Sequence, residues 1–221
     1  MDLLDAMHGR RSIRAYLSRP VEREVIEAVI EAARWAPSGV NTQPWDVAVV
    51  TGATKARIAG NILAARAAGE AERPDYRYYP AEWHEPYKSR RRACGLAMYA
   101  ALGIGRADEV KRLEAWNANY RFFDAPAGLL FFLDRRLGQG AWLDLGMFMQ
   151  NVMLAAEAHG LATCPQASVA DYPDLVRAAL GREDDAILVA GMALGYPDPD
   201  APVNAFRTDR EPVESFARFY E

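Results

Sequence analysis

The stretch AWLDLGMFMQNVMLAAEA, residues 141–158, is the most apolar run in this chain of 221 residues. It is long enough for about five turns of α-helix, and Gly160 follows at the point where such a helix would end. Its polar residues make it costly to place across a bilayer but suit a helix buried within a protein. They are Asp144, Gln150, Asn151 and Glu157. The stretch therefore predicts a central helix over residues 141–159.

Short apolar runs on either side of this helix predict buried strands. APAGLLFFLD (125–134) precedes the helix and AILVAGMALGY (186–196) follows it, while WDVAVV (45–50) is also strand-like. Apolar residues at helical spacing predict further helices at residues 2–9, 21–35, 53–66, 93–102, 107–119 and 172–180. Helices interleaved with a few strands, without a clean βαβ repeat, indicate an α+β or α/β fold. The length suits one domain spanning residues 1–221.

The composition narrows the function classes. A net charge of −4 and a pI near 5.5 argue against a nucleic-acid or membrane-surface binder, whose affinity would come from a broad positive field. The two cysteines, Cys94 and Cys164, are too few for a disulfide framework and fit a reducing cytosol. The first residues show no basic-then-apolar leader, so we expect no secretion signal. These features predict a cytoplasmic protein with no membrane or nucleic-acid partner.

The familiar side-chain motifs are weak in this sequence. GIGRAD (103–108) lacks the third glycine of a dinucleotide-binding fingerprint and follows a helical pattern. The three histidines are far apart and form no zinc motif, so no metal is expected. Cys164 has no C-x-x-C partner and is interpreted as a packing residue, and Ser38 lies outside any G-x-S-x-G turn. These absences favour a protein whose chemistry belongs to a cofactor.

Three arginines crowd residues 10–16, RRSIRAY, in spite of the acidic balance. If the segment is extended, its side chains alternate, so Arg10, Ser12 and Arg14 share one face. Guanidinium groups bind oxyanions through paired hydrogen bonds, so this face suits a phosphate or a carbonyl-rich ring. A solvated basic turn that pairs with nearby acidic residues explains the same pattern equally well.

A second polar segment, PSGVNTQPW (37–45), opens onto the strand predicted at 45–50. The side-chain amides of Asn41 and Gln43 carry both donors and acceptors, as the edge of a flavin pyrimidine requires. Gly39 would let the backbone approach a flat ring closely. An ordinary turn rich in Pro, Gly and Asn stays a plausible alternative.

Four segments, in this order, resemble the FMN-dependent nitroreductase family over essentially the whole chain. They are RRSIRAY (10–16), PSGVNTQPW (37–45), GLATCPQAS (160–168) and NAFRTDREP (204–212). WHEPYKSRRR (83–92) and NYRFFDAPAG (119–128) are similar to the branch that includes 4-nitrobenzoate reductases. The resemblance implies a nitroreductase fold of the α+β class, a central and mostly antiparallel sheet wrapped by helices in an intertwined homodimer.

The resemblance also implies an FMN site in the dimer interface. The first arginine segment and the tail arginines correspond to contacts with the phosphate and the pyrimidine oxygens. The loop after residue 36 corresponds to the partner's contribution beside the isoalloxazine ring, and a backbone N–H of segment 165–168 to the group facing flavin N5. The implied cofactor-binding residues are Arg10, Arg11, Ser12, Arg14, Pro37, Ser38, Gly39, Asn41, Gln43, Pro165, Gln166, Ala167, Ser168, Arg207 and Arg210.

The chemistry that the resemblance implies is a ping-pong reduction. NAD(P)H gives hydride to FMN N5, and a nitroaromatic or related acceptor then takes two electrons in the same pocket. No catalytic side chain is required, because the chemistry belongs to the flavin. The arginines would place positive charge near the N1–C2=O end of the ring, where negative charge collects on reduction.

Residues around the implied pocket are expected to select the acceptor. Residues 70–92, with three prolines and five aromatic residues, predict a loop or lid, and Val40, Trp83 and Tyr87 are candidates for substrate contact. Packing of the lid on its own subunit explains the two aromatic residues at least as well. The tail, 197–221, has few features that would let it fold alone and is expected to extend onto the partner subunit.

Alternatives on the same scaffold stay open at this point. Reductive dehalogenation, ene reduction and oxidative fragmentation of the flavin are three, and a flavin-binding module without turnover is a fourth. A halotyrosine dehalogenase would carry a lid set of Glu, Tyr and Lys, and Glu85, Tyr87 and Lys88 are present here without a clear alignment. The sequence does not distinguish NADH from NADPH.

Overall fold

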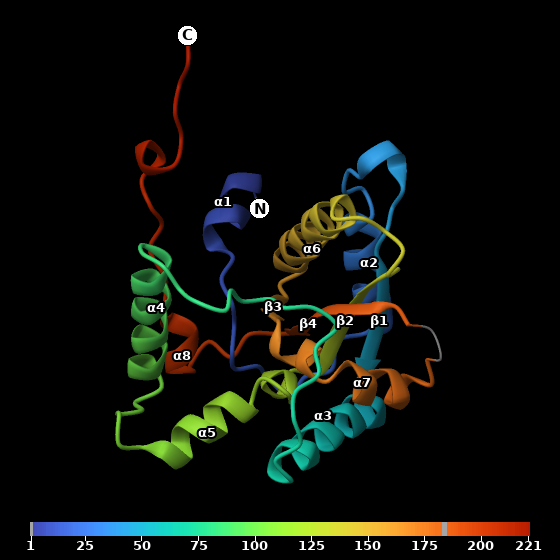
Figure 1. Cartoon of the computed structure of the whole chain (residues 1–221), viewed down its shortest axis with the longest axis vertical. Coiled ribbons are helices and arrows are strands. Elements are labelled where there is room, and N and C mark those ends of the chain that lie inside the picture. Colours follow the sequence, from blue (N-terminus) through green and yellow to red (C-terminus); the bar gives the residue numbers. More distant parts are fainter. Residues whose placement is uncertain (1, 183–184) are drawn as a thin grey trace.

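A four-stranded sheet forms the centre of the computed structural model, which describes residues 2–182 and 185–221 (Figure 1). The strand order is β1-β2-β4-β3, and each neighbouring pair is antiparallel. The strands are β1 (Asp46–Thr51), β2 (Ala127–Leu133), β3 (Ala162–Gln166) and β4 (Ile187–Gly195). The expected α+β architecture with an antiparallel sheet is confirmed, as are the three strands predicted from apolar runs.

Helices cover both faces of the sheet because β2 and β4 are apolar on both sides. In β2, Leu129 and Phe131 pack with α2 (Arg23–Ala33) and α6 (Gly140–Ala158), while Leu130 and Phe132 pack with the opposite helices. Successive strand residues point to opposite faces, so a continuous apolar run is what a strand buried on both sides requires. The opposite helices are α3 (Gly52–Ala67) and α7 (Pro173–Leu180).

The edge strand β3 was not predicted as a strand from the sequence. Pro165 has no backbone N–H to donate, and a proline within a run argues against a central strand. The structure resolves this by placing β3 at the edge of the sheet, where residues 10–16 run along its outer side. The N–H of Ile13 donates to the carbonyl of Thr163 at 3.0 Å, and Tyr16 bridges to Pro197. The arginine segment is therefore extended.

The remaining helices lie around this core (Figure 1). They are α1 (Leu3–Gly9), α4 (Tyr87–Ala101), α5 (Glu109–Asn117) and α8 (Pro202–Ala205). None of the residues of α4 and α5 is buried, and α4 packs on α8. The loop predicted over 70–92 is shorter than expected, because Tyr87 to Arg92 already belong to α4. Beyond α8 the tail runs away from the sheet to its end.

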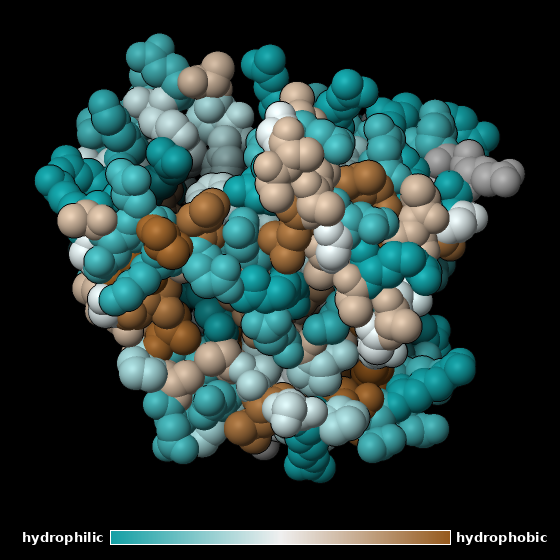
Figure 2. All heavy atoms as spheres, turned by 90° about the horizontal axis from the view of Figure 1, so that it is seen from below, coloured by the Kyte–Doolittle hydropathy of each residue, from teal (hydrophilic) through white to brown (hydrophobic). Residues whose placement is uncertain are grey.

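None of the helices in the described part of the chain is long and apolar enough to cross a bilayer. The face in Figure 2 is a mosaic in which hydrophobic patches are separated by hydrophilic residues. Large apolar side chains are exposed on α1, at Leu3, Leu4 and Met7, and on α6, at Leu143 and Met147.

Candidate functional site

The arginine segment and the start of β3 form one polar centre. Burial raises the pKa of the Cys164 thiol, and the Arg14 and Arg10 guanidiniums and the Ser12 side chain partly oppose this rise. Arg10, Ser12 and Arg14 therefore lie near enough to Cys164 to act on its thiol. A buried thiol with a raised pKa is a weak nucleophile, so the packing interpretation of Cys164 holds.

Unpaired hydrogen-bonding groups lie together at the end of β3, in residues 166–168, and one more lies near its start, at Thr163. The side-chain oxygens of Thr163, Gln166 and Ser168 are buried without a hydrogen-bond partner in the described structure. Within the same described residues, no acceptor is found for the backbone N–H of Ala167 or of Ser168. Buried polar groups are nearly always paired, so a cluster of this kind indicates a place where a ligand completes the bonding. Gln166 is held in place by its amide N–H, which donates to the carbonyl of Asn119.

The loop Pro37–Gln43 adopts an unusual backbone conformation. Val40, Asn41 and Gln43 have positive φ angles of 44°, 59° and 48°, which cost energy in residues other than glycine. Side chains hold the loop: Ser38 Oγ accepts from the N–H of Gln43 at 2.9 Å, and the Gln43 amide donates to the carbonyl of Asn41 at 3.2 Å. Strain that is held in this way is typical of functional sites.

A buried carboxylate ties this loop to the central helix. Asp144 of α6 is 8% exposed, and its Oδ2 accepts from the N–H of Gly39 at 3.2 Å. Val40, at the tip of the loop, is 98% exposed, so the loop presents itself outward from its own chain. The amide side chains of the loop are also exposed and face solvent in a single chain.

The loop and the arginine segment lie at opposite ends of α6. Gly39 contacts Asp144 near the beginning of the helix. Arg10, Arg11 and Arg207 act on Glu157 near its end, where burial raises the pKa of this carboxyl and the three guanidiniums partly oppose the rise. Asp144 and Glu157 are thirteen positions apart, which corresponds to about 20 Å along a helix. One chain therefore does not bring together the two segments that the sequence assigned to one site.

The two tail arginines are placed differently. Arg207 lies by the arginine segment, and its guanidinium donates to the carbonyl of His8 at 3.1 Å. Arg210 instead bonds within the tail, to the carbonyl and hydroxyl of Thr208 at 3.1 and 2.8 Å. The structure of one chain thus joins Arg207, but not Arg210, to the polar centre.

The candidate substrate-contact residues of the lid pack against neighbouring arginines. The Trp83 ring is tilted against that of Tyr79, with ring centres 5.5 Å apart, and the Arg91 guanidinium lies 5.1 Å from the centre of the Trp83 ring. Tyr87, the first residue of α4, is exposed and has Arg90 at 5.8 Å from its ring. Arg90 also pairs with Glu211 of the tail at 2.9 Å. The basic run at 90–92 is thus a solvated helix start that also fixes the tail against α4.

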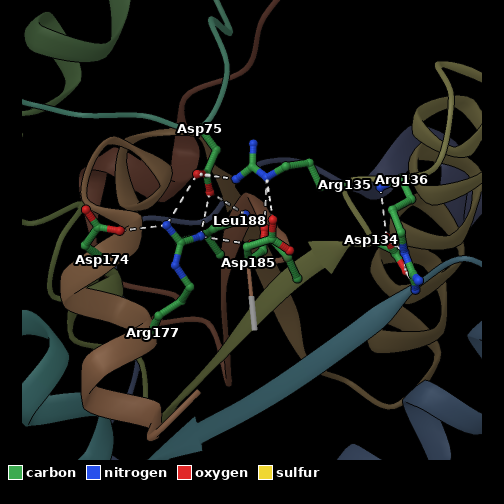
Figure 3. A network of polar contacts seen from close by, with 9 residues as sticks. Asp75, Asp134, Arg135, Arg136, Asp174, Arg177, Asp185 and Leu188 are labelled. Carbon is green, nitrogen blue, oxygen red and sulfur yellow. Dashed lines mark hydrogen bonds and ion pairs between the residues drawn. The ribbon is translucent and has the colours of Figure 1, made fainter. Parts of the chain in front are cut away.

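The lid is anchored at its base by a buried ion-pair network (Figure 3). The carboxylate of Asp75 accepts from Arg177 and Arg135, each at 2.8 Å, and from the N–H of Leu188 at 3.1 Å. Burial acts to raise the pKa of Asp75, but these hydrogen bonds outweigh it and the pKa is lowered. Next to it, the hydroxyl of Tyr76 donates to the carbonyl of Val189 at 2.6 Å. The lid therefore begins from a fixed point on β4 and α7.

A hollow of about 320 Å³ lies elsewhere, between the base of the lid and the start of α7. It is lined by Glu70, Ala71, Arg73, Asp171, Tyr172, Pro173, Asp174 and Leu175. A neighbouring hollow is lined by residues of α3, the same loop and Tyr172. None of the residues predicted for the cofactor lines either one, as expected if the two halves of the site lie about 20 Å apart in one chain.

Comparison with known proteins decides the family. The model of the nitroreductase family matches residues 7–196 of the chain. The chain belongs to the nitroreductase family. Its curated relatives include the nitrobenzene nitroreductase of Ectopseudomonas oleovorans, 39% identical over 97% of this chain and 95% of that protein. The 4-nitrobenzoate reductase of Pseudomonas putida is 37% identical over 96% of this chain and 92% of the relative.

Solved structures of the family have the same fold. The FMN and NADPH-dependent nitroreductase NfnB from Sphigopyxis sp. strain HMH is 40% identical, with a TM-score of 0.97 over the full length of both chains. The FMN-dependent nitroreductase NfnB from Mycobacterium smegmatis, in complex with NADPH, is 36% identical with a TM-score of 0.92, again over both full lengths. The nitroreductase fold predicted from the four segments is thus confirmed over the whole chain.

Two polar residues of this nitroreductase-family chain were missed as parts of the site. Asp144 stood out as a charge within the most apolar run of the sequence, and a buried carboxylate needs a partner, so a signal was present. Asn204 is 4% exposed and bonds to the backbone of the arginine segment. No spacing or pattern in the tail distinguishes it from other polar residues.

Proposed function

We propose that this protein is a homodimeric, FMN-dependent oxidoreductase that uses NAD(P)H to reduce nitroaromatic or related acceptors. The observation that carries the proposal is the set of unpaired groups at the end of β3, beside the arginine segment. The family, and relatives named for nitroaromatic reduction over nearly the whole chain, support the same reaction. When bound, FMN supplies the chemistry of accepting a hydride and passing on two electrons.

The residues around β3 suit FMN by their chemistry. Arg10 and Arg14 offer guanidinium donors for a phosphate or for ring oxygens, and Arg207 adds a third cation from the tail. The free N–H groups of Ala167 and Ser168 can donate to a ring nitrogen, and the unpaired oxygen of Gln166 can accept a ring N–H. Positive charge held near the ring favours the reduced, anionic cofactor.

A second copy of the chain completes the site in this proposal. The loop Pro37–Gln43 lies about 20 Å along α6 from the arginines, so a partner's loop has to supply the contacts on the other side of the ring. The apolar residues exposed on α1 and α6 give a surface for such a partner, because α1 packs against α6. The tail, with Arg210 and several exposed aromatic side chains, would lie on the partner.

The acceptor pocket is proposed to lie between the exposed loop tip and the lid. The Val40 side chain is almost fully exposed at the tip of the loop, while Trp83 and Tyr87 offer aromatic surfaces at the end of the lid. Both cysteines are unpaired, which supports the reducing environment of the cytoplasm as the place of action.

Anaerobic visible spectroscopy tests the function directly. The purified protein, supplied with FMN, is titrated with NADH and then with NADPH, followed by 4-nitrobenzoate. A flavin band that bleaches with nucleotide and returns with the nitro compound is the expected result and identifies the electron donor. A band that responds to neither nucleotide favours flavin fragmentation, dehalogenation with another donor, or binding alone. Failure to bind FMN at all would overturn the proposal.

A further inference from the structure

Asn204 is the most completely hydrogen-bonded side chain next to the arginine segment. It lies in α8, at the start of the tail, and is 4% exposed. Its Oδ1 accepts from the N–H groups of Arg14 at 2.9 Å and Ala15 at 3.2 Å. Its Nδ2 donates to the carbonyls of Ala15 at 2.8 Å and Asp198 at 2.9 Å. The side-chain amide thus makes the four bonds that it can offer.

The main chain of Asn204 adds a contact to a guanidinium. Its carbonyl accepts from Nε of Arg11 at 2.7 Å. On the other side of the segment, the N–H of Ile13 bonds to Thr163 of β3. The segment is therefore held by the edge strand, by this buried asparagine and, at its end, by backbone bonds to Tyr196, Pro197 and Asp198. Because every polar atom of the amide is used within the protein, Asn204 has none left for a ligand.

We propose that Asn204 is a positioning residue that holds Arg11 and Arg14 in place for the phosphate of the cofactor. This inference rests on the proposed function, since it assumes that FMN is the cofactor. The guanidiniums project from this backbone, so their direction depends on how the backbone is fixed at Arg11 and Arg14. Loss of the amide would leave the part-buried N–H groups of Arg14 and Ala15 without an acceptor and loosen the segment at these two residues.

The role predicts a selective loss of phosphate recognition. Riboflavin has the same ring as FMN and lacks the phosphate, so the ratio of the two affinities measures what the phosphate contributes. A displaced arginine segment lowers affinity for FMN and leaves riboflavin binding almost unchanged. General destabilisation of the protein would lower both affinities together. The ratio therefore separates positioning from a merely structural role.

The experiment compares flavin binding in full-length variants after removal and restoration of the flavin. Asn204→Ala removes the amide, and Asn204→Ser is a milder change that keeps a short hydroxyl. Asn117→Ala is a matched control, because the Asn117 amide also accepts from an arginine, Arg66, at 3.2 Å but lies in α5. Dissociation constants for FMN and riboflavin are measured by titration of flavin fluorescence.

Asn204→Ala is expected to weaken FMN binding about tenfold and riboflavin binding less than about twofold, with Asn204→Ser between it and the wild type. The control should keep the wild-type ratio. Parallel losses for both flavins, or no loss in either, would overturn the inference. If the wild type binds neither flavin, the proposed function fails instead, which is a different result.

If neither variant folds, amide hydrogen exchange on the wild type tests the positioning role of Asn204 instead. The N–H groups of Arg14 and Ala15 should then exchange slowly even without FMN, because Asn204 already holds them. Rapid exchange of these two amides in the flavin-free protein would show that the segment is not held in advance, and would refute the inference.

Discussion

Removal of the Asp75 carboxylate tests how the lid is anchored. Asp75 is 8% exposed and lies between Arg177, which is 13% exposed, and Arg135, which is 41% exposed (Figure 3). In Asp75→Ala, the N–H of Leu188 loses its acceptor and the buried guanidinium of Arg177 loses its main partner. The exposed Arg135 can be solvated by water and adds little to the cost.

The expected cost follows from these contacts. Breaking a buried ion pair by removing one partner costs about 3–5 kcal/mol. The value here should be at the lower end, about 3 kcal/mol, because Arg177 keeps Asp174 at 2.7 Å and the carbonyl of Ala186 at 2.9 Å. For a chain of this length, that corresponds to a fall in Tm of about 6–12 °C.

The assay is thermal unfolding at one fixed protein concentration, since Tm depends on concentration wherever copies of a chain associate. Asp134→Ala is the control, because Asp134 pairs with the solvent-exposed Arg136 two residues away and should change Tm very little. Cleavage by trypsin after Arg77 in the lid gives a second measurement and should become faster in Asp75→Ala alone. Equal Tm values for the wild type and both variants would refute the reasoning.

Three further outcomes are expected. Burial and the nearby Glu72 raise the pKa of Asp171 to about 6, so the folded state keeps a proton that the unfolded state loses above about pH 4. Stability should therefore fall from about pH 4 to pH 6, and Asp171→Asn should flatten this part of the curve in pH-dependent denaturation; an unchanged slope would contradict the assignment. Gly195→Ala would place a Cβ 2.6 Å from Pro126 and should cost about 1–3 kcal/mol in urea denaturation, whereas a wild-type midpoint would show that the strand shifts freely. Asp144→Ala removes the acceptor of the Gly39 N–H and should weaken FMN binding about tenfold in a flavin titration, a prediction that unchanged affinity would reject.

Much of the fold could be predicted because burial on both faces leaves a clear pattern. The apolar runs at 125–134 and 186–196 became β2 and β4, and the central helix α6 begins and ends within a residue of its predicted bounds. The start of α4 was missed, because residues 87–92 (YKSRRR) follow Pro86 and carry almost no apolar residues from which a helical spacing could be detected. Strand β3 was missed because of Pro165, which only an edge position tolerates.

The candidate site was only partly predictable. Residue types that bind anions and ring edges are visible in the sequence, so the arginine segment and the amide loop could be named. The residue patterns themselves do not reveal that α6 keeps them about 20 Å apart, since this distance follows from three-dimensional packing; only the family resemblance, which assigns the loop to the partner subunit, indicated that they do not meet in one chain. The roles of Asp144 and Asn204 depend on contacts between residues more than 100 positions apart, which no local pattern reveals.

The distance along α6 has a consequence for mixtures of defective chains. If each site takes its arginines from one copy and its loop from the other, a chain without Arg10 and Arg14 and a chain with a disrupted loop 37–43 are both inactive alone. In a dimer of one chain of each kind, both defects meet in one site and the other site is intact. Random mixing makes half of the dimers of this kind, so about a quarter of the sites should work. Two inactive preparations would thus complement each other when unfolded and refolded together.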